Sequence, residues 1–136
     1  MSVPTGQRAK SKFEVLIKAR ELAKYTLDIT KNTKVFSPEY QTALTNDIIS
    51  TAKNIFIKSW TANNIRVTNP DHAKQRKELQ ESAALDCNNL LALIDLAKSV
   101  YHLKSKRIKF WAEKTITVRS FIREWTTSDT KRYKNV

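Results

Sequence analysis

The residues with the clearest chemical potential are basic and gather toward the C-terminal end of the chain. The candidates for contact with phosphate groups in this region are Lys104, Lys106, Arg107, Lys109, Lys114, Arg119, Arg123, Lys131 and Arg132. Lys18 and Arg20 join them from the first third of the chain. Basic side chains neutralise the phosphates of nucleic acids, so we expect salt-dependent binding that is largely indifferent to base sequence.

The net charge of +12 is concentrated at the two ends of the chain. Residues 1–37 contribute +5 (eight Lys/Arg against three acids), and residues 101–136 contribute +7 (ten against three). The segments 38–69 and 70–100 contribute +1 and −1. If the two ends are neighbours in space, the molecule has one strongly basic side, which is typical of nucleic-acid-binding proteins. A basic surface that serves only solubility, or one that binds an anionic protein, would show the same balance.

Catalysis has few candidate residues in this sequence. Arg66 and His72 are separated by five residues, a spacing that resembles the Arg–His pair of the HEPN ribonucleases. In such a pair the arginine could hold a phosphate while the histidine moves a proton. Val67 stands where that family has a polar residue, so this ribonuclease is a minor alternative. Cys87 falls on the apolar side of its segment and is interpreted as a buried hydrophobe, and we predict no catalytic residue.

A metal site or a bound cofactor is not expected either. Di-iron sites in helical bundles use a Glu three residues before each ligand His. Asn69 holds that position before His72, and Ser99 holds it before His102. Gly6 is the only glycine, which excludes a glycine-rich phosphate-binding loop.

The elements that must position the basic residues are helices. With one glycine and three prolines, the chain lacks the turn residues that sheets and hairpins need. Ser37-Pro38-Glu39 and Asn69-Pro70-Asp71 each combine an N-cap residue, a proline suited to the first helical position and an acid. These signals and the apolar periodicity predict an all-α protein. Its helices are expected at about 12–31, 38–64, 70–103 and 105–127.

These helices are expected to form one domain, residues 11–128. A disordered basic lead-in (1–10) would precede it, and a basic tail (129–136) would follow. Short connections between long helices favour an up-down-up-down antiparallel four-helix bundle. In that topology the first and fourth helices are neighbours, which would bring the two basic segments together.

The last helix is expected to carry one complete apolar stripe and part of a second. Spacings of three and four residues place one set on a single side: Ile108, Trp111, Thr115, Val118, Ile122 and Trp125. Basic residues flank this stripe, with Lys114 and Arg107 on one shoulder and Arg119 and Arg123 on the other. Phe110 and Phe121 share a second line about a quarter-turn away. Because exposed aromatic residues usually mark a contact, we interpret this pair as a subunit interface.

Nothing in the sequence directs the chain to a membrane. No run of residues is long and apolar enough to span one, and the first residues lack the apolar core of a signal peptide. The single cysteine excludes an intrachain disulfide. We therefore expect a cytoplasmic protein with no membrane partner.

Five segments, in this order, carry a family resemblance: FSPEYQTALTNDIISTAKNIF, ANNIRV, RKELQESAALDCNNLLALIDLA, HLKSKRIKFWAEK and IREWTTSDTKRY. Together they resemble the accessory variability determinant of diversity-generating retroelements, over about residues 11–133. The related four-helix proteins of ribosomal-RNA intervening sequences typically carry a Ser-Asn-Ile-Ala-Glu-Gly-like segment. This chain has Lys58-Ser59-Trp60-Thr61-Ala62-Asn63 there, which favours the retroelement family.

The resemblance implies a four-helix bundle that assembles into a basic homopentameric barrel without catalytic activity. Proteins of this family bind the element's reverse transcriptase and nucleic acid, and support mutagenic copying of template RNA into cDNA. Two alternatives stay open: a protein scaffold of the intervening-sequence type, and the Arg66/His72 ribonuclease. The preferred nucleic acid, the binding site of the polymerase and the helices that line any central channel are left open by the sequence.

Overall fold

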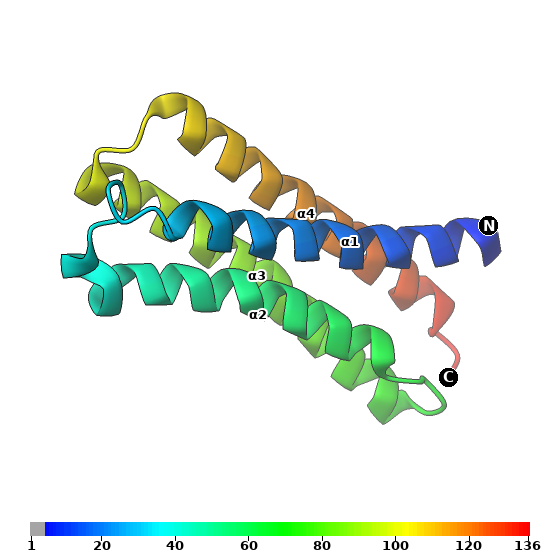
Figure 1. The fold of residues 1–136 in the computed structure, drawn as a ribbon. Helices are drawn as coiled ribbons and strands as arrows, with labels where there is room; N and C mark the ends of the chain where they lie inside the picture. The colour runs from blue at the N-terminus through cyan, green and yellow to red at the C-terminus, as the bar shows by residue number, and fades with distance from the viewer. Residues whose placement is uncertain (1–4) are drawn as a thin grey trace.

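The computed structural model describes residues 5–136, with side chains from Glu14 onward, as four long helices (Figure 1). The helices are α1 (Thr5–Thr30), α2 (Asn46–Asn64), α3 (Pro70–Tyr101) and α4 (Ser105–Arg132). Two short turns precede α2, the 3₁₀ turn η1 (Pro38–Tyr40) and the π-helical turn η2 (Gln41–Thr45). Residues 5–136 contain no strand, and the predicted all-helical class with four helices is confirmed.

Each long helix lies beside two others. Helix α1 packs against α2 and α4, and α3 also packs against α2 and α4. In Figure 1 successive helices run in opposite directions, so the α1–α2 and α3–α4 connections lie at the same end of the molecule. The first and last helices, which carry most of the positive charge, are therefore neighbours.

The start of the second predicted helix is less regular than expected. The Ser37 hydroxyl accepts the backbone N–H of Glu39 at 3.4 Å, as its role of N-cap predicts, but a 3₁₀ turn and a π-helical turn precede α2. Leu44 and Thr45 are adjacent and both buried. The wider turn lets both side chains reach the core, where the Thr45 hydroxyl lies 2.6 Å from the Tyr101 hydroxyl of α3.

Both ends of the chain are more helical than the sequence indicated. Helix α1 begins at Thr5, so the expected disordered lead-in is helical from that residue, and its first four residues lie outside the described part. No proline follows Pro4 in this stretch, and residues 7–10 are mostly good helix formers. Helix α4 ends at Arg132, five residues beyond the predicted end at 127, so half of the predicted tail belongs to it.

A buried polar cluster explains the extension of α4. The Arg76 Nε group donates to the Asp129 carboxylate at 2.6 Å, and the Gln80 amide donates to the same carboxylate at 2.7 Å. All three side chains are buried, and the Arg76 guanidinium lies 5.2 Å from the centre of the Trp125 ring. The last turns of α4 are therefore tied to α3, which stabilises them in the helical form.

The predicted apolar stripe of the last helix lies in the core. Five of its six residues are buried, namely Trp111, Thr115, Val118, Ile122 and Trp125, and Ile108 is half-buried. The Trp111 indole N–H donates to the Thr26 hydroxyl of α1 at 3.1 Å, which satisfies its polar group inside the bundle. No helix within residues 5–136 is long and apolar enough to cross a membrane.

Candidate nucleic-acid interface

A basic cleft opens at the end of the bundle where α1 ends and α4 begins. It has a volume of about 900 Å³. Its walls come from α1, from the connection that follows α1, from the α3–α4 turn and from the first turns of α4. Five cations line it: Lys34, Lys104, Lys106, Arg107 and Lys109. Glu113 is the single carboxylate among the lining residues, so the cleft carries a strong positive potential.

None of these five cations forms an ion pair within the part of the chain whose side chains are described. Two cations outside the cleft form close ion pairs: Lys58 lies 2.6 Å from Asp86, and Arg76 lies 2.6 Å from Asp129. Like charges repel when they converge on a concave surface. Repulsion between these cations therefore raises the free energy of the empty cleft, and an anionic ligand would reduce this repulsion.

The α3–α4 turn places three of the cations at the mouth of the cleft. Helix α3 ends at Tyr101, and the capping residue His102 has a left-handed backbone with φ 54° and ψ 47°. The following N–H, of Leu103, donates to the Lys98 carbonyl at 3.3 Å, and α4 begins at Ser105. This compact reversal carries Lys104, Lys106 and Arg107 directly onto the side of the bundle that α1 occupies.

Lys34 completes the cleft from a connection that sequence reasoning did not single out. The Asn32 carbonyl accepts the N–H groups of Val35 at 3.1 Å and Phe36 at 2.8 Å, and Phe36 is fully buried. This anchored connection holds the exposed Lys34 beside the α3–α4 turn. The predicted topology could have indicated this position of Lys34. In an antiparallel bundle the α1–α2 and α3–α4 connections lie at the same end, so they are neighbours.

Three aromatic side chains line the cleft, those of Tyr25, Tyr101 and Phe110. The ring centres of Tyr25 and Phe110 are 5.1 Å apart at an interplanar angle of 65°, an edge-to-face arrangement. Burial raises the pKa of the Tyr25 hydroxyl, which the nearby Arg107 partly opposes, so this hydroxyl is neutral at physiological pH. The Phe110 side chain is 50% exposed. An aromatic face is thus available among the cations.

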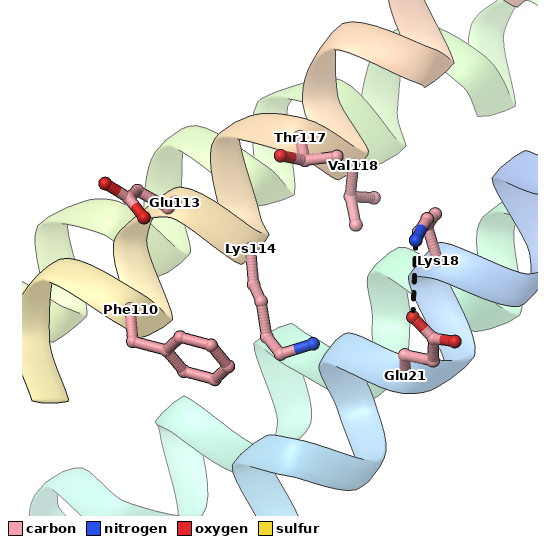
Figure 2. Close-up of a pocket in the computed structure, with 7 residues that line it drawn as sticks. All are labelled: Lys18, Glu21, Phe110, Glu113, Lys114, Thr117 and Val118. Carbon is pink, nitrogen blue, oxygen red and sulfur yellow. Dashed lines mark ion pairs between the residues drawn. The ribbon is translucent and has the colours of Figure 1, made fainter.

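A second, smaller hollow lies farther along the groove between α1 and α4 (Figure 2). Lys114 extends from α4 toward α1, and its ammonium lies 5.2 Å from the centre of the Phe110 ring. Lys18 lines the same hollow from α1 and pairs with Glu21 at 3.8 Å. Two predicted contacts, Lys18 and Lys114, therefore adjoin the basic cleft, although Lys18 is partly neutralised.

The other predicted residues of α4 do not belong to this site. Arg119 donates to the Asn88 side chain of α3 at 2.7 Å, and Arg123 lines a groove between α3 and α4 beside Leu85. The sequence pattern placed Lys114 and Arg107 on one side of the apolar stripe and Arg119 and Arg123 on the other, and the structure has the same division. Because α4 separates the two shoulders, Arg119 and Arg123 cannot contact a ligand in the basic cleft.

Three further predicted residues are exposed outside the basic cleft. Lys131 and Arg132 lie at the far end of α4, roughly 40 Å along the helix from Lys104. The Arg132 guanidinium lies 5.0 Å from the centre of the Tyr133 ring, and Arg20 is exposed on α1. The eleven residues predicted from the sequence therefore do not form one continuous site.

The predicted aromatic pair has two different environments. Phe110 lies on the wall of the basic cleft, as described above. Phe121 is half-buried and packs against the core of its own chain. Of the two residues predicted to form a subunit interface, Phe121 is therefore partly covered within a single copy of the protein.

In the alternative Arg66/His72 pair, Arg66 lies in the connection between α2 and α3, and His72 lies in the first turn of α3. The His72 Nδ1 atom accepts the Thr68 backbone N–H at 3.3 Å and lies 2.9 Å from the Thr68 hydroxyl. The His72 backbone N–H donates to Asn69, the N-cap of α3, at 2.8 Å. These contacts give the imidazole a structural role in the connection.

Cys87 is buried in the core of the bundle. Burial raises the pKa of the Cys87 thiol to about 12, with a minor opposing effect of Arg119. The thiol is therefore protonated and unreactive at neutral pH. Among the described residues no group of three or more His, Cys, Asp and Glu side chains is arranged to hold a metal ion.

The basic cleft thus combines unpaired cations with an exposed aromatic face on a concave surface. Such a surface is suited to binding a polyanion that also presents flat, apolar groups. Comparison with known proteins gave no match: no protein-family model, no curated protein and no solved structure matches this chain.

Proposed function

We propose that this protein is a non-enzymatic nucleic-acid-binding subunit and that the basic cleft is its binding site. The observation that carries the proposal is the convergence on one concave surface of five cations that form no ion pair with any described side chain. A nucleic-acid backbone would neutralise them and release its own counterions, which favours binding at low salt. Four of the five cations are lysines, which bind phosphate as point charges.

The sequence resemblance supports a more specific role. We propose that the protein serves a diversity-generating retroelement, binding its template RNA or cDNA and its reverse transcriptase in the cytoplasm. The resemblance spans about residues 11–133, and the helical architecture and the basic cleft agree with it. A test is co-elution of the purified protein with the element's reverse transcriptase after nuclease treatment. Separate elution at low salt would contradict the polymerase partnership.

Self-association is the second part of this proposal, as a homopentameric barrel. The α3–α4 face carries large apolar side chains that are about half exposed: Leu85 at 57%, Leu96 at 50% and Ile116 at 41%. Such residues supply apolar surface for a subunit contact. Light scattering at high salt, which strips bound nucleic acid, should give five times the chain mass of 15.7 kDa. A monomeric mass would contradict the barrel.

Binding of nucleic acid is tested with a charge-reversal pair in the cleft and a matched pair outside it. Lys106→Glu/Lys109→Glu changes two cleft cations, and Lys53→Glu/Lys77→Glu makes the same net change at exposed sites on α2 and α3. Affinity for a labelled oligonucleotide is measured between about 50 and 200 mM salt. The cleft variant should bind at least roughly tenfold more weakly, with a shallower salt dependence, and the control variant should stay near wild type.

Equal weakening of both variants would show that only overall charge matters, and would contradict the cleft as the site. Absence of binding by the wild type at low salt would favour the protein scaffold. The ribonuclease alternative is less favoured because the His72 ring is engaged by Thr68. The ribonuclease alternative predicts that the wild type cleaves RNA and that His72→Ala does not. Equal cleavage by the two proteins would contradict it.

A further inference from the structure

We propose that the basic cleft binds unpaired nucleic acid in preference to duplex, with one base stacked on the Phe110 ring and the flanking phosphates held by the surrounding cations. The inference rests on the proposed function above and adds which form of nucleic acid the cleft selects. Phe110 then acts as a stacking platform, in place of the subunit contact that the sequence pattern indicated.

Phe110 separates the two hollows of the α1–α4 groove. It lines the basic cleft on one side and the smaller hollow with Lys18 and Lys114 on the other. Lys114 lies 5.2 Å from the ring centre, and Tyr25 approaches in an edge-to-face arrangement at 5.1 Å. Figure 2 shows the ring directed into the gap between α4 and α1. Half of the side chain remains exposed to solvent.

The neighbours of Phe110 leave it suited to stacking. Its only aromatic contact within the described residues is the edge-to-face contact with Tyr25, so no other ring is stacked on it. The Lys114 ammonium lies over the ring, 5.2 Å from its centre, so a base would use the face that Lys114 leaves open or would displace this ammonium. Base–aromatic stacking needs a flat, uncovered face on both partners. In a duplex each base is covered above and below by its neighbours, whereas in a single strand a base can be turned outward onto an aromatic side chain.

The cations are spaced to hold the backbone on both sides of such a base. Lys106 and Arg107 lie one helical turn before Phe110 on α4, and Lys114 lies one turn after it. A row of cation, aromatic ring and cation therefore runs along the groove. This order matches a strand whose backbone passes along α4 while one base turns toward α1.

The charge around Phe110 disfavours its use as a subunit contact. Covering it with an apolar protein surface would remove Lys106, Arg107 and Lys109 from water without supplying opposite charges, which is unfavourable. Leu96, on α3, is equally exposed and lies outside the basic cleft. A subunit contact at the α3–α4 face avoids this cost.

The test compares variants of the intact protein with two probes. The probes are a fluorescein-labelled mixed-sequence strand of roughly 20 nucleotides, longer than one binding site, and the same strand annealed to its complement. Phe110→Ala removes the ring, Phe110→Leu keeps apolar bulk without a π-face, and Phe110→Trp enlarges the face. Ile57→Ala is the matched control, because Ile57 on α2 is a 49% exposed apolar residue outside both the cleft and the proposed subunit contact.

Phe110→Ala and Phe110→Leu should both weaken binding of the single strand by roughly 5- to 100-fold, the range for loss of one stacked base. Duplex binding should be unchanged. Phe110→Trp should bind the single strand at least as tightly as wild type, and the control should match wild type with both probes. Thermal unfolding checks that each variant is folded.

The outcomes separate this inference from the proposed function. If Lys106→Glu/Lys109→Glu weakens both probes while Phe110→Ala changes neither, the stacking inference is wrong and the nucleic-acid function stands. If no probe binds the wild type at low salt, both fail. If Phe110→Ala lowers the mass measured by light scattering and leaves affinity unchanged, Phe110 is a subunit contact and the stacking inference is overturned.

Discussion

Arg76 and Asp129 form a buried ion pair across 53 positions of sequence, with the Arg76 Nε atom 2.6 Å from Asp129 Oδ2. The guanidinium also donates to the Ile65 carbonyl at 3.4 Å and faces the rings of Trp125 and Tyr133. One side chain therefore joins the α2–α3 connection, α3, α4 and the residue after α4. This pair holds together the end of the bundle opposite the basic cleft.

Removal of one partner of this pair should be costly. Arg76→Met leaves the Asp129 carboxylate buried and without its cation, so the free energy of unfolding should fall by about 3–5 kcal/mol. The double variant Arg76→Met/Asp129→Leu should be more stable than Arg76→Met alone, because no unpaired charge remains. Urea unfolding followed by circular dichroism measures both. Strictly additive losses in the double variant would contradict the pairing.

A surface pair provides the control for that experiment. Lys18 and Glu21 are 3.8 Å apart, with side chains 39% and 48% exposed. Exposed pairs contribute little to stability because solvent screens them. Glu21→Gln should therefore change the free energy of unfolding by less than about 1 kcal/mol.

The Thr26 hydroxyl should be needed for the core around Trp111. It donates to the Leu22 carbonyl at 2.9 Å and accepts the Trp111 indole N–H at 3.1 Å. Thr26→Val keeps the shape but leaves the buried N–H without a partner, at an expected cost of about 1–3 kcal/mol. Thr26→Ser keeps the hydroxyl and should cost less. Denaturant unfolding compares the two, and equal stability of both variants would contradict the hydrogen-bonding role.

Residue 102 should favour glycine. His102 is the only described residue other than glycine with a positive φ, 54°, a conformation that glycine adopts without steric cost. His102→Gly should stabilise the protein by about 0.5–1 kcal/mol, and His102→Val should destabilise it by about 1–2 kcal/mol. Midpoints of urea unfolding check both. A loss of stability in His102→Gly would show that the imidazole makes contacts that outweigh the backbone strain.

The buried thiol of Cys87 should make the folded protein less stable as the pH rises into the alkaline range. Its pKa is raised by burial from 9.0 to about 12 in the folded state. Above pH 9 the unfolded chain loses this proton while the folded chain keeps it, so stability falls as pH rises between 9 and 12. The slope contributed by this group is at most about 1.4 kcal/mol per pH unit.

The measurement compares unfolding of the wild type and of Cys87→Ala at several pH values in that window. The variant starts less stable because it leaves a small cavity, but its stability should fall less steeply with pH. In the native wild type, iodoacetamide should label Cys87 only at the rate of unfolding. Fast labelling at pH 8 without unfolding would contradict a buried thiol.

The helical class and the interior face of α4 followed from local patterns. Ser37 and Asn69 act as N-caps, and the stripe from Trp111 to Trp125 is buried, because capping and apolar periodicity depend on residues within a few positions of one another. The block of basic residues at the start of α4 was visible for the same reason. The first helix was expected beside this block from the predicted topology, but the individual residues that meet the block were not visible.

Long-range contacts decided the remaining features. Lys34 joins the basic cleft only because two connections meet at one end of the bundle, and Arg119 is removed from it because α4 stands between. Helix α4 continues to Arg132 because Asp129 forms an ion pair with Arg76 of α3. Which distant residues meet depends on how the helices pack. Packing is a property of the whole chain, so a short stretch of sequence does not determine it.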